Sequence, residues 1–263
     1  MLFELPPFAR LPLRFDAAAL RAALDVLPQD AWQPHFNTGY YQGDWSGIAL
    51  TAPADAVTPL SPGQGEGRPT AHCDDFWREQ LGRLQTRLRS ARLLRLGPGG
   101  SIAEHRDYDL GQPGADLRLH VPIVTDEAVE FLLDGRMVPM AAGECWFLDL
   151  SRPHRVDNHG GQARIHLVLD CSPSPWLAGQ IEAGLADTPP ARDSRGAQAF
   201  AEFRGRVQAD AALTAELAAH TDHETFAAAV LAHATAAGLR FSRADLDSAM
   251  TRGRREWIEQ WIV

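Results

Sequence analysis

The chain has 263 residues, of which 45% are hydrophobic, and it includes seven tryptophans and eleven phenylalanines. This is enough apolar material for one large core, or for one core and a small additional domain. The formal net charge of −9 leaves no basic surface that could neutralise many phosphates, so we expect no nucleic acid partner and instead a small molecule or a protein.

Cysteine usage and hydropathy indicate the cellular compartment in which the protein is expected. Three widely spaced cysteines, Cys73, Cys145 and Cys171, suggest neither a disulfide framework nor a CxxC metal site, which fits a reducing compartment. The N-terminal residues lack the features of a signal peptide, and no apolar run approaches the roughly 18 residues that span a membrane. We therefore expect a cytoplasmic protein with no membrane partner.

The N-terminal part of the chain is expected to be helical in two places. In residues 16–27, leucines recur at spacings of four and three behind Asp16, a typical N-cap residue, which predicts an amphipathic helix. Residues 57–69 concentrate proline and glycine and are expected to form an exposed loop. A second helix is predicted over residues 74–88.

Short apolar or alternating runs follow, separated by Gly, Pro and Asp. Between Arg92 and Cys171 they are RLLRLG, LRLHVPIV, VEFLLDG, ECWFLDL, HRVDN and ARIHLVLDC. Strands at such close spacing, with turn residues between them, are typical of a sandwich or a barrel. The sequence therefore predicts a mainly β core with a double-stranded β-helix (jelly-roll or cupin-like) fold, flanked by helices.

Beyond Pro175 the composition changes to alanine-rich segments with apolar residues at helical spacing, after a turn-rich stretch at 188–196. Two residue pairs in this tail match the capping box of a helix start. The pairs are Thr221 with Glu224 and Ser242 with Asp245. We therefore predict a β domain over residues 1–187, with a helical N-terminal flank, and a small all-α domain over residues 197–263.

A pattern of two histidines and one carboxylate indicates a metal site. His105 and Asp107 are two residues apart, so a strand would direct both side chains to one face. His154 follows 49 residues after His105 and would complete a two-histidine, one-carboxylate triad, which leaves positions open on iron(II). The spacing alone also fits a surface turn and a capped loop histidine. A metal site is favoured because each residue lies at the edge of a predicted strand.

Other polar residues alternate with apolar ones in the predicted strands. Arg118 and His120 share one strand face that should point into the barrel, where they either bind a ligand or form an internal hydrogen-bonded pair. Arg164 adjoins the apolar run IHLVL and is expected to have a partner. His166, two residues later, either faces the same cavity or is a core histidine.

Four sequence blocks occur in a fixed order between Leu96 and Cys171: PGGSIAEHRD, LRLHVPIVT, GECWFLDLSRPHRVDN and RIHLVLDC. In order and spacing they resemble the aspartyl/asparaginyl β-hydroxylase family of 2-oxoglutarate oxygenases, which also includes free-proline and lipid A hydroxylases. The resemblance implies iron(II), 2-oxoglutarate and O2 as cofactor and cosubstrates. It also implies hydroxylation of an amino acid or of a peptidyl Asp, Asn or Pro-like side chain, with release of succinate and CO2.

The resemblance assigns roles to individual residues. It makes His105, Asp107 and His154 the iron ligands and Arg164 the partner of the distal carboxylate of 2-oxoglutarate. A guanidinium offers a planar, bidentate and permanently charged fork, which suits a buried dicarboxylate. Chloride-ligated halogenases of the wider superfamily replace the acidic ligand by a small residue, so Asp107 favours hydroxylation.

Further residues are implied near the carboxylates of cosubstrate and substrate. By resemblance, Arg118 and His120 lie close to both. Arg92 matches the place where proline hydroxylases of the family have an arginine for the substrate carboxylate. Arg92 and Arg95 fall on opposite faces of one strand, so at most one of them can point into the cavity. His166 is a further candidate on the substrate side.

The tail carries a second set of features: a D-x-x-L helix from Asp210, an Ala-rich central helix, a Gly-Leu-x-Phe-Ser turn at 238–242 and a closing D-L-x-x-A helix at 245–249. In these features residues 203–250 resemble the leader-peptide domain associated with nitrogen-fixation and nitrile-hydratase-like precursors. The resemblance implies a docking module for a protein partner. A helical extension that only stabilises the barrel is the alternative.

Two other functions stay open from the sequence. A cupin-like protein would hold a structural or sensory metal in the same triad without oxygenase turnover. A docking protein would use the barrel only as a scaffold. Neither needs a site for 2-oxoglutarate, so binding of this cosubstrate separates them from a hydroxylase.

Overall fold

The computed structural model describes residues 5–61, 63–112 and 114–259. Within them the chain forms two compact units. The first consists of the residues up to Leu133 and of Val138–Pro190, and the second of Asp134–Met137 and the residues from Ala191 onward. The first unit is built on β-strands and the second mainly on helices.

The chain forms two antiparallel sheets. The larger sheet has the strand order β1-β11-β8-β13-β6-β4-β2, and β5 pairs with β4. Its strands are β1 Phe8–Arg14, β2 Gln33–Pro34, β4 Trp45–Pro53, β5 Gly67–Pro69, β6 Leu88–Leu96, β8 Leu117–Val124, β11 Glu144–Leu148 and β13 Arg164–Cys171. The smaller sheet has the order β10-β9-β12-β7-β3. Its strands are β3 Tyr41–Gln42, β7 Ser101–His105, β9 Val129–Leu133, β10 Arg136–Met137 and β12 His154–Asn158.

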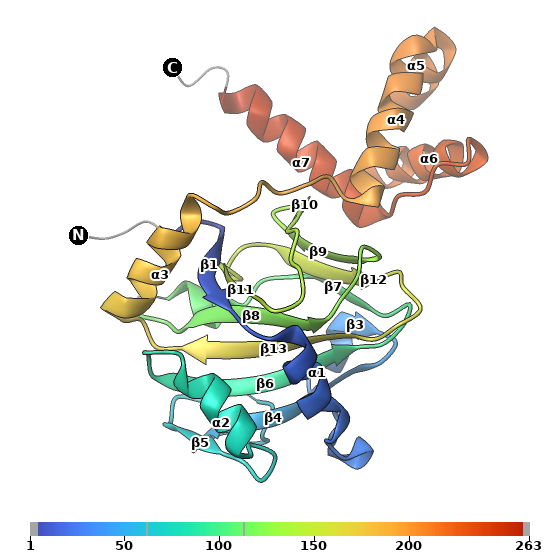
Figure 1. The fold of residues 1–263 in the computed structure, drawn as a ribbon. Helices are drawn as coiled ribbons and strands as arrows, with labels where there is room; N and C mark the ends of the chain where they lie inside the picture. Colours follow the sequence, from blue (N-terminus) through green and yellow to red (C-terminus); the bar gives the residue numbers. More distant parts are fainter. Residues whose placement is uncertain (1–4, 62, 113, 260–263) are drawn as a thin grey trace. The chain divides into compact units, whose positions relative to one another are not determined.

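From β6 to β13 the chain passes back and forth between the sheets. β6, β8, β11 and β13 lie in the larger sheet, while β7, β9 and β12 lie in the smaller one, which is stacked on it (Figure 1). This winding is the double-stranded β-helix, so the predicted fold is confirmed. Each of the six runs predicted as strands is also confirmed as one.

One face of β13 is apolar and the other is polar, because side chains alternate along a strand. The apolar face joins the core beneath helices α1 (Ala17–Asp25), α2 (Asp75–Gly82) and α3 (Pro175–Leu185). Its residues are Ile165, Leu167, Leu169 and Cys171. The other face carries Arg164, His166 and Asp170 toward the smaller sheet. A second core cluster includes Trp146 of β11 and Val156 of β12, and therefore takes its residues from both sheets.

The helices of the first unit differ from the prediction in one place. α1 begins after Asp16, whose carboxylate accepts hydrogen bonds from the amides of Ala18 and Ala19, as the N-cap prediction requires. α2 ends at Gly82, so the prediction that this helix extends to residue 88 is wrong. Leu88 instead pairs with Cys171 in the larger sheet, and this long-range pairing overrides local helix propensity. Short 3-10 turns lie at Gln29–Ala31, Thr38–Tyr40 and Tyr108–Gly111.

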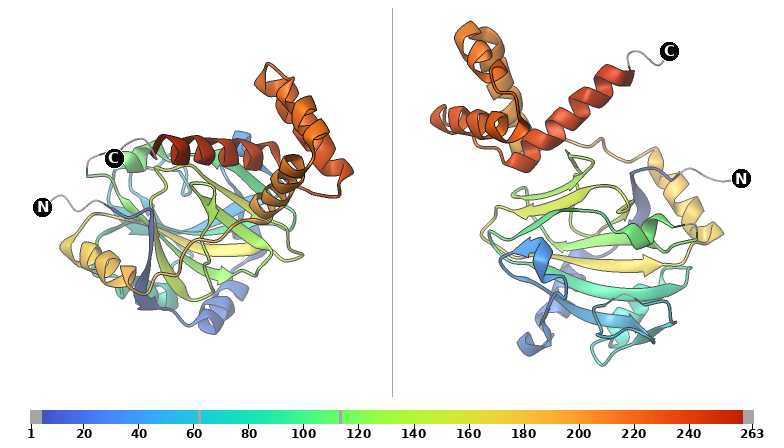
Figure 2. Two further views of the ribbon diagram at one scale, coloured as in Figure 1. Left: turned by 90° about the horizontal axis from the view of Figure 1, so that it is seen from above. Right: turned by 180° about the vertical axis from the view of Figure 1, so that it is seen from behind.

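The second unit is a small helical bundle with a core of its own, and Figure 2 gives two further views of its helices. The helices are α4 Arg195–Ala209, α5 Ala211–Ala218, α6 His223–Ala236 and α7 Arg243–Glu259. The buried residues are Phe203, Leu217, Ala227, Val230, Ala234 and Leu246. The predicted all-α C-terminal part is therefore confirmed. Within the described part of the chain, none of the helices combines the length and hydropathy that membrane crossing requires.

One of the two predicted capping boxes is present. The amide of Asp245 donates to the hydroxyl of Ser242 at 3.1 Å, and the amide of Ser242 donates to the Asp245 carboxylate at 2.7 Å. At the start of α6 the prediction is wrong by one residue. Asp222, not Thr221, is the N-cap there, and its carboxylate accepts from the amide of Thr225 at 2.9 Å.

Two glycines of α3 allow a matched test of how tightly this helix packs on β1. A methyl group added at Gly184 would lie 2.3 Å from the carbonyl oxygen of Arg10, whereas one at Gly179 would meet no atom within 4 Å. We expect Gly184→Ala to lower the free energy of unfolding, and Gly179→Ala to raise it by about 0.5–1 kcal/mol through helix propensity. Urea unfolding measures both signs, and a stabilised Gly184→Ala variant would contradict the close packing.

Candidate metal and cosubstrate site

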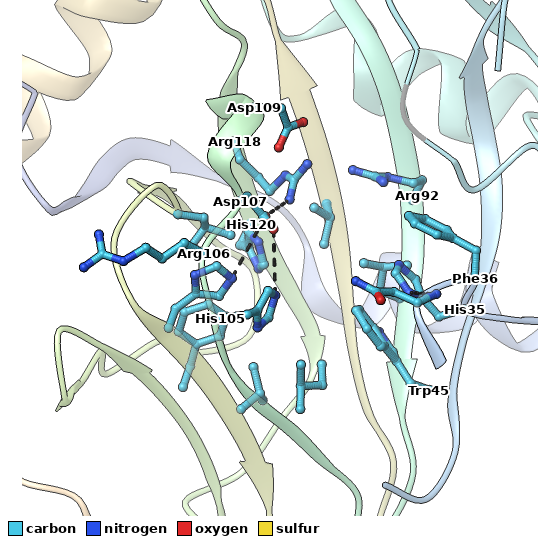
Figure 3. A pocket seen from close by; sticks show the side chains of 18 of the residues that line it. His35, Phe36, Trp45, Arg92, His105, Arg106, Asp107, Asp109, Arg118 and His120 are labelled. Carbon is cyan, nitrogen blue, oxygen red and sulfur yellow. Dashed lines mark hydrogen bonds and ion pairs between the residues drawn. The ribbon is translucent and has the colours of Figure 1, made fainter. Parts of the chain in front are cut away.

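A cavity of about 590 Å³ lies between the two sheets. Strands β4, β6, β8 and β13 of the larger sheet and β7, β9 and β12 of the smaller sheet all contribute side chains to its wall. Segments 35–37 and 106–109, together with Gly63, Gln64 and Leu150, also line the cavity. Figure 3 shows the polar side chains that converge there. Ligand pockets in proteins typically have volumes of about 300–1,000 Å³.

His105, Asp107 and His154 come together at this cavity. The register of β12 on β7 places His154 directly opposite His105. Asp107 lies just after β7, and its amide donates to the carbonyl of Leu150 at 2.9 Å. The Asp107 carboxylate is 3.8 Å from Nε2 of His105 and 4.0 Å from Nε2 of His154, and the three ligand atoms all lie within 4.8 Å of one another. A single metal ion fits this spacing.

Main-chain carbonyls orient both imidazole rings. Nδ1 of His105 lies 2.8 Å from the carbonyl oxygen of Ala103, and Nδ1 of His154 lies 3.0 Å from that of Arg152. A carbonyl only accepts, so Nδ1 carries a proton in both rings and Nε2 is the nitrogen left to bind a metal. Burial lowers the pKa of His154 to about 4, so this ring is neutral at physiological pH, as metal ligation requires.

Arg164 is a buried cation on β13. It is 2% exposed, and among the described residues no acidic side chain forms an ion pair with it. One Nη2 hydrogen bond reaches Nδ1 of His166 at 2.9 Å, while Nε has no partner. Burial lowers the pKa of Arg164 to about 9, and the guanidinium still carries its charge at neutral pH. Such a group has the chemistry of an anion-binding site.

His120 and His166 lie beside this guanidinium. Their Nδ1 atoms are 3.3 Å apart, and Nε2 of each ring has no hydrogen-bond partner. Burial and the nearby Arg164 hold the pKa of both histidines well below the usual value, so both rings are neutral. His120 lines the cavity, whereas His166 does not. Phe131 packs against both His120 and His154.

Arg92 and Arg118 share one carboxylate, that of Asp170. Nε of Arg118 donates to Oδ1 of Asp170 at 2.6 Å, and Nη2 of Arg92 donates to Oδ2 at 2.5 Å. Nη1 of Arg118 also donates to the carboxylate of Asp107 (Figure 3). Burial alone would raise the pKa of Asp170, but the charges of Arg118 and Arg92 hold it well below its usual value. Asp170 is therefore ionised, and both of its oxygens accept hydrogen bonds from arginine.

Arg95 does not line the cavity. Its Nε donates to the hydroxyl of Ser46 at 3.0 Å, its Nη2 lies 3.1 Å from the Asp44 carboxylate, and its Cζ lies 4.5 Å from the ring centre of Trp32. Arg92 therefore lines the cavity, whereas Arg95, on the same strand, does not.

The sequence reasoning missed the aromatic wall opposite the triad. His35 stacks on Trp45 with ring centres 3.5 Å apart, and on Phe36 with ring centres 4.4 Å apart (Figure 3). Burial, then Arg92 and Arg118, lower the pKa of His35 to about 3. The apolar run that forms β4 was a usable strand signal, but nothing in residues 33–45 marked a binding site. Asp170 was missed too, although it alternates in register with Arg164.

The chain belongs to the aspartyl/asparaginyl β-hydroxylase family, because the family's model matches residues 24–173, more than half of the chain. The predicted family membership is thus confirmed for the β unit. The match ends before the helical tail. The leader-peptide resemblance and a protein partner for residues 197–263 therefore stay predictions.

The individual relatives match this chain only over a short segment or at low sequence identity. L-proline cis-4-hydroxylase of Rhizobium meliloti (strain 1021) is 30% identical over 83 residues, which are 32% of this chain but only 29% of that protein. A 2OG-Fe(II) oxygenase family oxidoreductase from Burkholderia pseudomallei is similar in structure over 63% of this chain and 85% of its own, with 17% identity and a TM-score of 0.43. A Pseudomonas putida prolyl-4-hydroxylase matches over 64% and 93%, with 18% identity and a TM-score of 0.38.

The buried histidines predict an acid-sensitive fold. The pKa of His35, about 3 in the folded protein, lies below its ordinary value of 6.5, so its contribution is present above pH 6.5 and is lost as the pH falls toward 3. Within that window one such histidine contributes a slope of about 1.4 kcal/mol per pH unit. We expect urea unfolding of metal-free His35→Gln to show a shallower loss of stability than wild type between about pH 6.5 and pH 5. Equal slopes would contradict the neutral buried state of His35.

Proposed function

We propose that the protein is an iron(II)- and 2-oxoglutarate-dependent dioxygenase. It hydroxylates an amino acid or a peptidyl side chain of the Asp, Asn or Pro type, and releases succinate and CO2. The observation that carries the proposal is Arg164, a buried guanidinium without an acidic partner among the described residues, on the sheet that faces a two-histidine, one-carboxylate triad. Membership of the β-hydroxylase family supports the same reaction class.

The donor set fits iron(II). His105 and His154 offer imidazole nitrogens, and Asp107 offers a carboxylate oxygen. Two histidines and one carboxylate with open positions are the donor set of non-haem iron oxygenases. Iron held here would supply the activation of O2 and the oxidation of a substrate C–H bond. The chain's own part is to hold the rings and the carboxylate in place through main-chain hydrogen bonds.

The surroundings of Arg164 fit the distal carboxylate of 2-oxoglutarate. Its Nε lacks a partner, and the guanidinium is a planar, bidentate donor. His120 lines the same part of the cavity and has an unpartnered Nε2. Phe131 packs against both His120 and His154, and its ring centre lies 5.9 Å from Cζ of Arg164, so this end of the cavity has an apolar wall. A dicarboxylate bound here would neutralise the buried cation.

The substrate is assigned to the remaining part of the cavity. Arg92 and Arg118 supply cationic groups there, and His35, Phe36 and Trp45 supply an aromatic wall. A carboxylate on the substrate would bind the guanidinium groups, while its apolar part would lie on the rings. Both a free amino acid and a peptidyl side chain satisfy this description.

A turnover assay tests the proposal. Protein loaded anaerobically with iron(II) should, on admission of O2, convert 2-oxoglutarate to succinate, and a panel of amino acids and short peptides should raise the rate. His154→Ala should abolish succinate formation, because it removes one of three protein ligands. His233→Ala in the helical unit, where His233 pairs with Glu216, is the matched control and should retain the rate. Binding of iron without any binding of 2-oxoglutarate would instead favour a cupin-like metal protein.

Arg164→Met separates a ligand-binding role from a structural one. Removing a buried, uncompensated charge should raise the unfolding temperature of the ligand-free protein. The same change should weaken 2-oxoglutarate binding by at least about 30-fold, since losing a buried charge partner costs about 2 kcal/mol or more. Thermal melts and calorimetric titration measure both effects, with Arg95→Met as the control outside the cavity. Unchanged 2-oxoglutarate affinity in Arg164→Met would refute the assignment.

A further inference from the structure

Asp170 is a buried carboxylate to which the proposed reaction gives no role. It lies near the end of β13, on the same face as Arg164, and its side chain is 12% exposed. Both oxygens are engaged. Oδ1 accepts from Nε of Arg118 at 2.6 Å, and Oδ2 accepts from Nη2 of Arg92 at 2.5 Å and from the hydroxyl of Ser90 at 2.7 Å. One carboxylate therefore bridges two guanidinium groups.

The bridge extends to the metal triad. Arg118, held by Asp170 on one side, donates to Oδ2 of Asp107 on the other. Arg92, Asp170, Arg118 and Asp107 thus form a row in which positive and negative groups alternate and the formal charges cancel. One end of the row is a metal ligand of the proposed site, and the other end lines the substrate side of the cavity.

We propose that Asp170 is a positioning residue that anchors Arg118 and thereby orients Asp107 for metal binding. Arg118 donates to Oδ2 of Asp107, which lies 4.0 Å from Nε2 of His154, while Oδ1 lies 3.8 Å from Nε2 of His105, so this hydrogen bond sets how the carboxylate faces the two histidines. Hydrogen-bonded partners of a ligating carboxylate fix its orientation and contribute to metal affinity. The inference rests on the proposed function in one respect, namely that the triad binds a divalent metal.

Loss of the Asp170 charge has a defined consequence. With a neutral amide at this position, Arg92 and Arg118 would be left with Asp107 as the remaining carboxylate of the row. Arg92 already experiences the attraction of Asp107. Both guanidinium groups would then compete with the metal for Asp107, and the row would carry one extra positive charge that repels a divalent cation. Metal binding should therefore weaken.

The chain offers a matched control in Asp116. Its side chain is 11% exposed and forms an ion pair with Arg89, whose side chain is 19% exposed. Within the described part of the chain, Asp116 forms no hydrogen bond or ion pair with Asp107 or Arg118, and its further hydrogen bond is to Ser172. Asp116→Asn therefore removes a comparably buried carboxylate from an arginine without touching the row.

The test is binding of Mn²⁺, a redox-silent stand-in for iron(II), to the metal-free full chain. Electron paramagnetic resonance follows the free ion, and thermal melts confirm folding. We expect Asp170→Asn to raise the Kd for Mn²⁺ about tenfold or more, whereas Asp116→Asn should keep it within about twofold of wild type. Ser90→Ala, which removes a neutral hydrogen bond but keeps the charge, should also stay near wild type.

A folded Asp170→Asn variant with the wild-type Kd overturns the inference, and so does an equal weakening in Asp170→Asn and Asp116→Asn. Should the single variant unfold, the double variant Asp170→Asn/Arg92→Met leaves no unpaired Arg92 charge and takes its place. It should still bind Mn²⁺ more weakly than wild type because Arg118 lacks its anchor, and wild-type affinity there overturns the inference. A wild-type chain that binds no Mn²⁺ refutes the metal site itself. This outcome distinguishes failure of the proposed function from failure of the role proposed for Asp170.

Discussion

The antiparallel pairing of β12 with β7 is the interaction on which the candidate site depends. Its register sets His154 opposite His105, and main-chain carbonyls accept from Nδ1 of both rings. The main-chain amide of Asp107 donates to the carbonyl of Leu150, in the segment between β11 and β12. Main-chain hydrogen bonds therefore hold both imidazole rings and the backbone of Asp107 in the positions that bring the three ligand atoms together.

The larger sheet faces this triad with an excess of positive charge. Arg92, Arg118 and Arg164 point into the space between the sheets, and Asp170 is shared by the first two. Arg164 is left without an acidic partner among the described residues. A buried, uncompensated cation destabilises a ligand-free protein, so its most direct explanation is an anionic ligand. The smaller sheet thus provides the metal ligands, and the larger sheet provides the anion-binding groups.

Much of the site could be predicted because strands alternate with a period of two. The alternation in LRLHVPIV placed Arg118 and His120 on one face, and both do line the cavity. The same rule applies to Asp170, but an aspartate near the end of a strand and close to a proline is easily taken for a turn residue. His35 could not be found in this way. It lies just after β2, and its position depends on stacking with Trp45 of β4.

The sequence by itself determined the class of fold, six of the strands between β6 and β13, the helical tail and the family, because hydrophobic periodicity and ordered motifs are local properties of the chain. It also named the residues of the triad. The tertiary structure alone decided that α2 stops at Gly82, that Arg92 and not Arg95 reaches the cavity, and that Asp170 joins two arginines to Asp107. These outcomes depend on strand register and on charges that meet only after folding, and no local pattern encodes them.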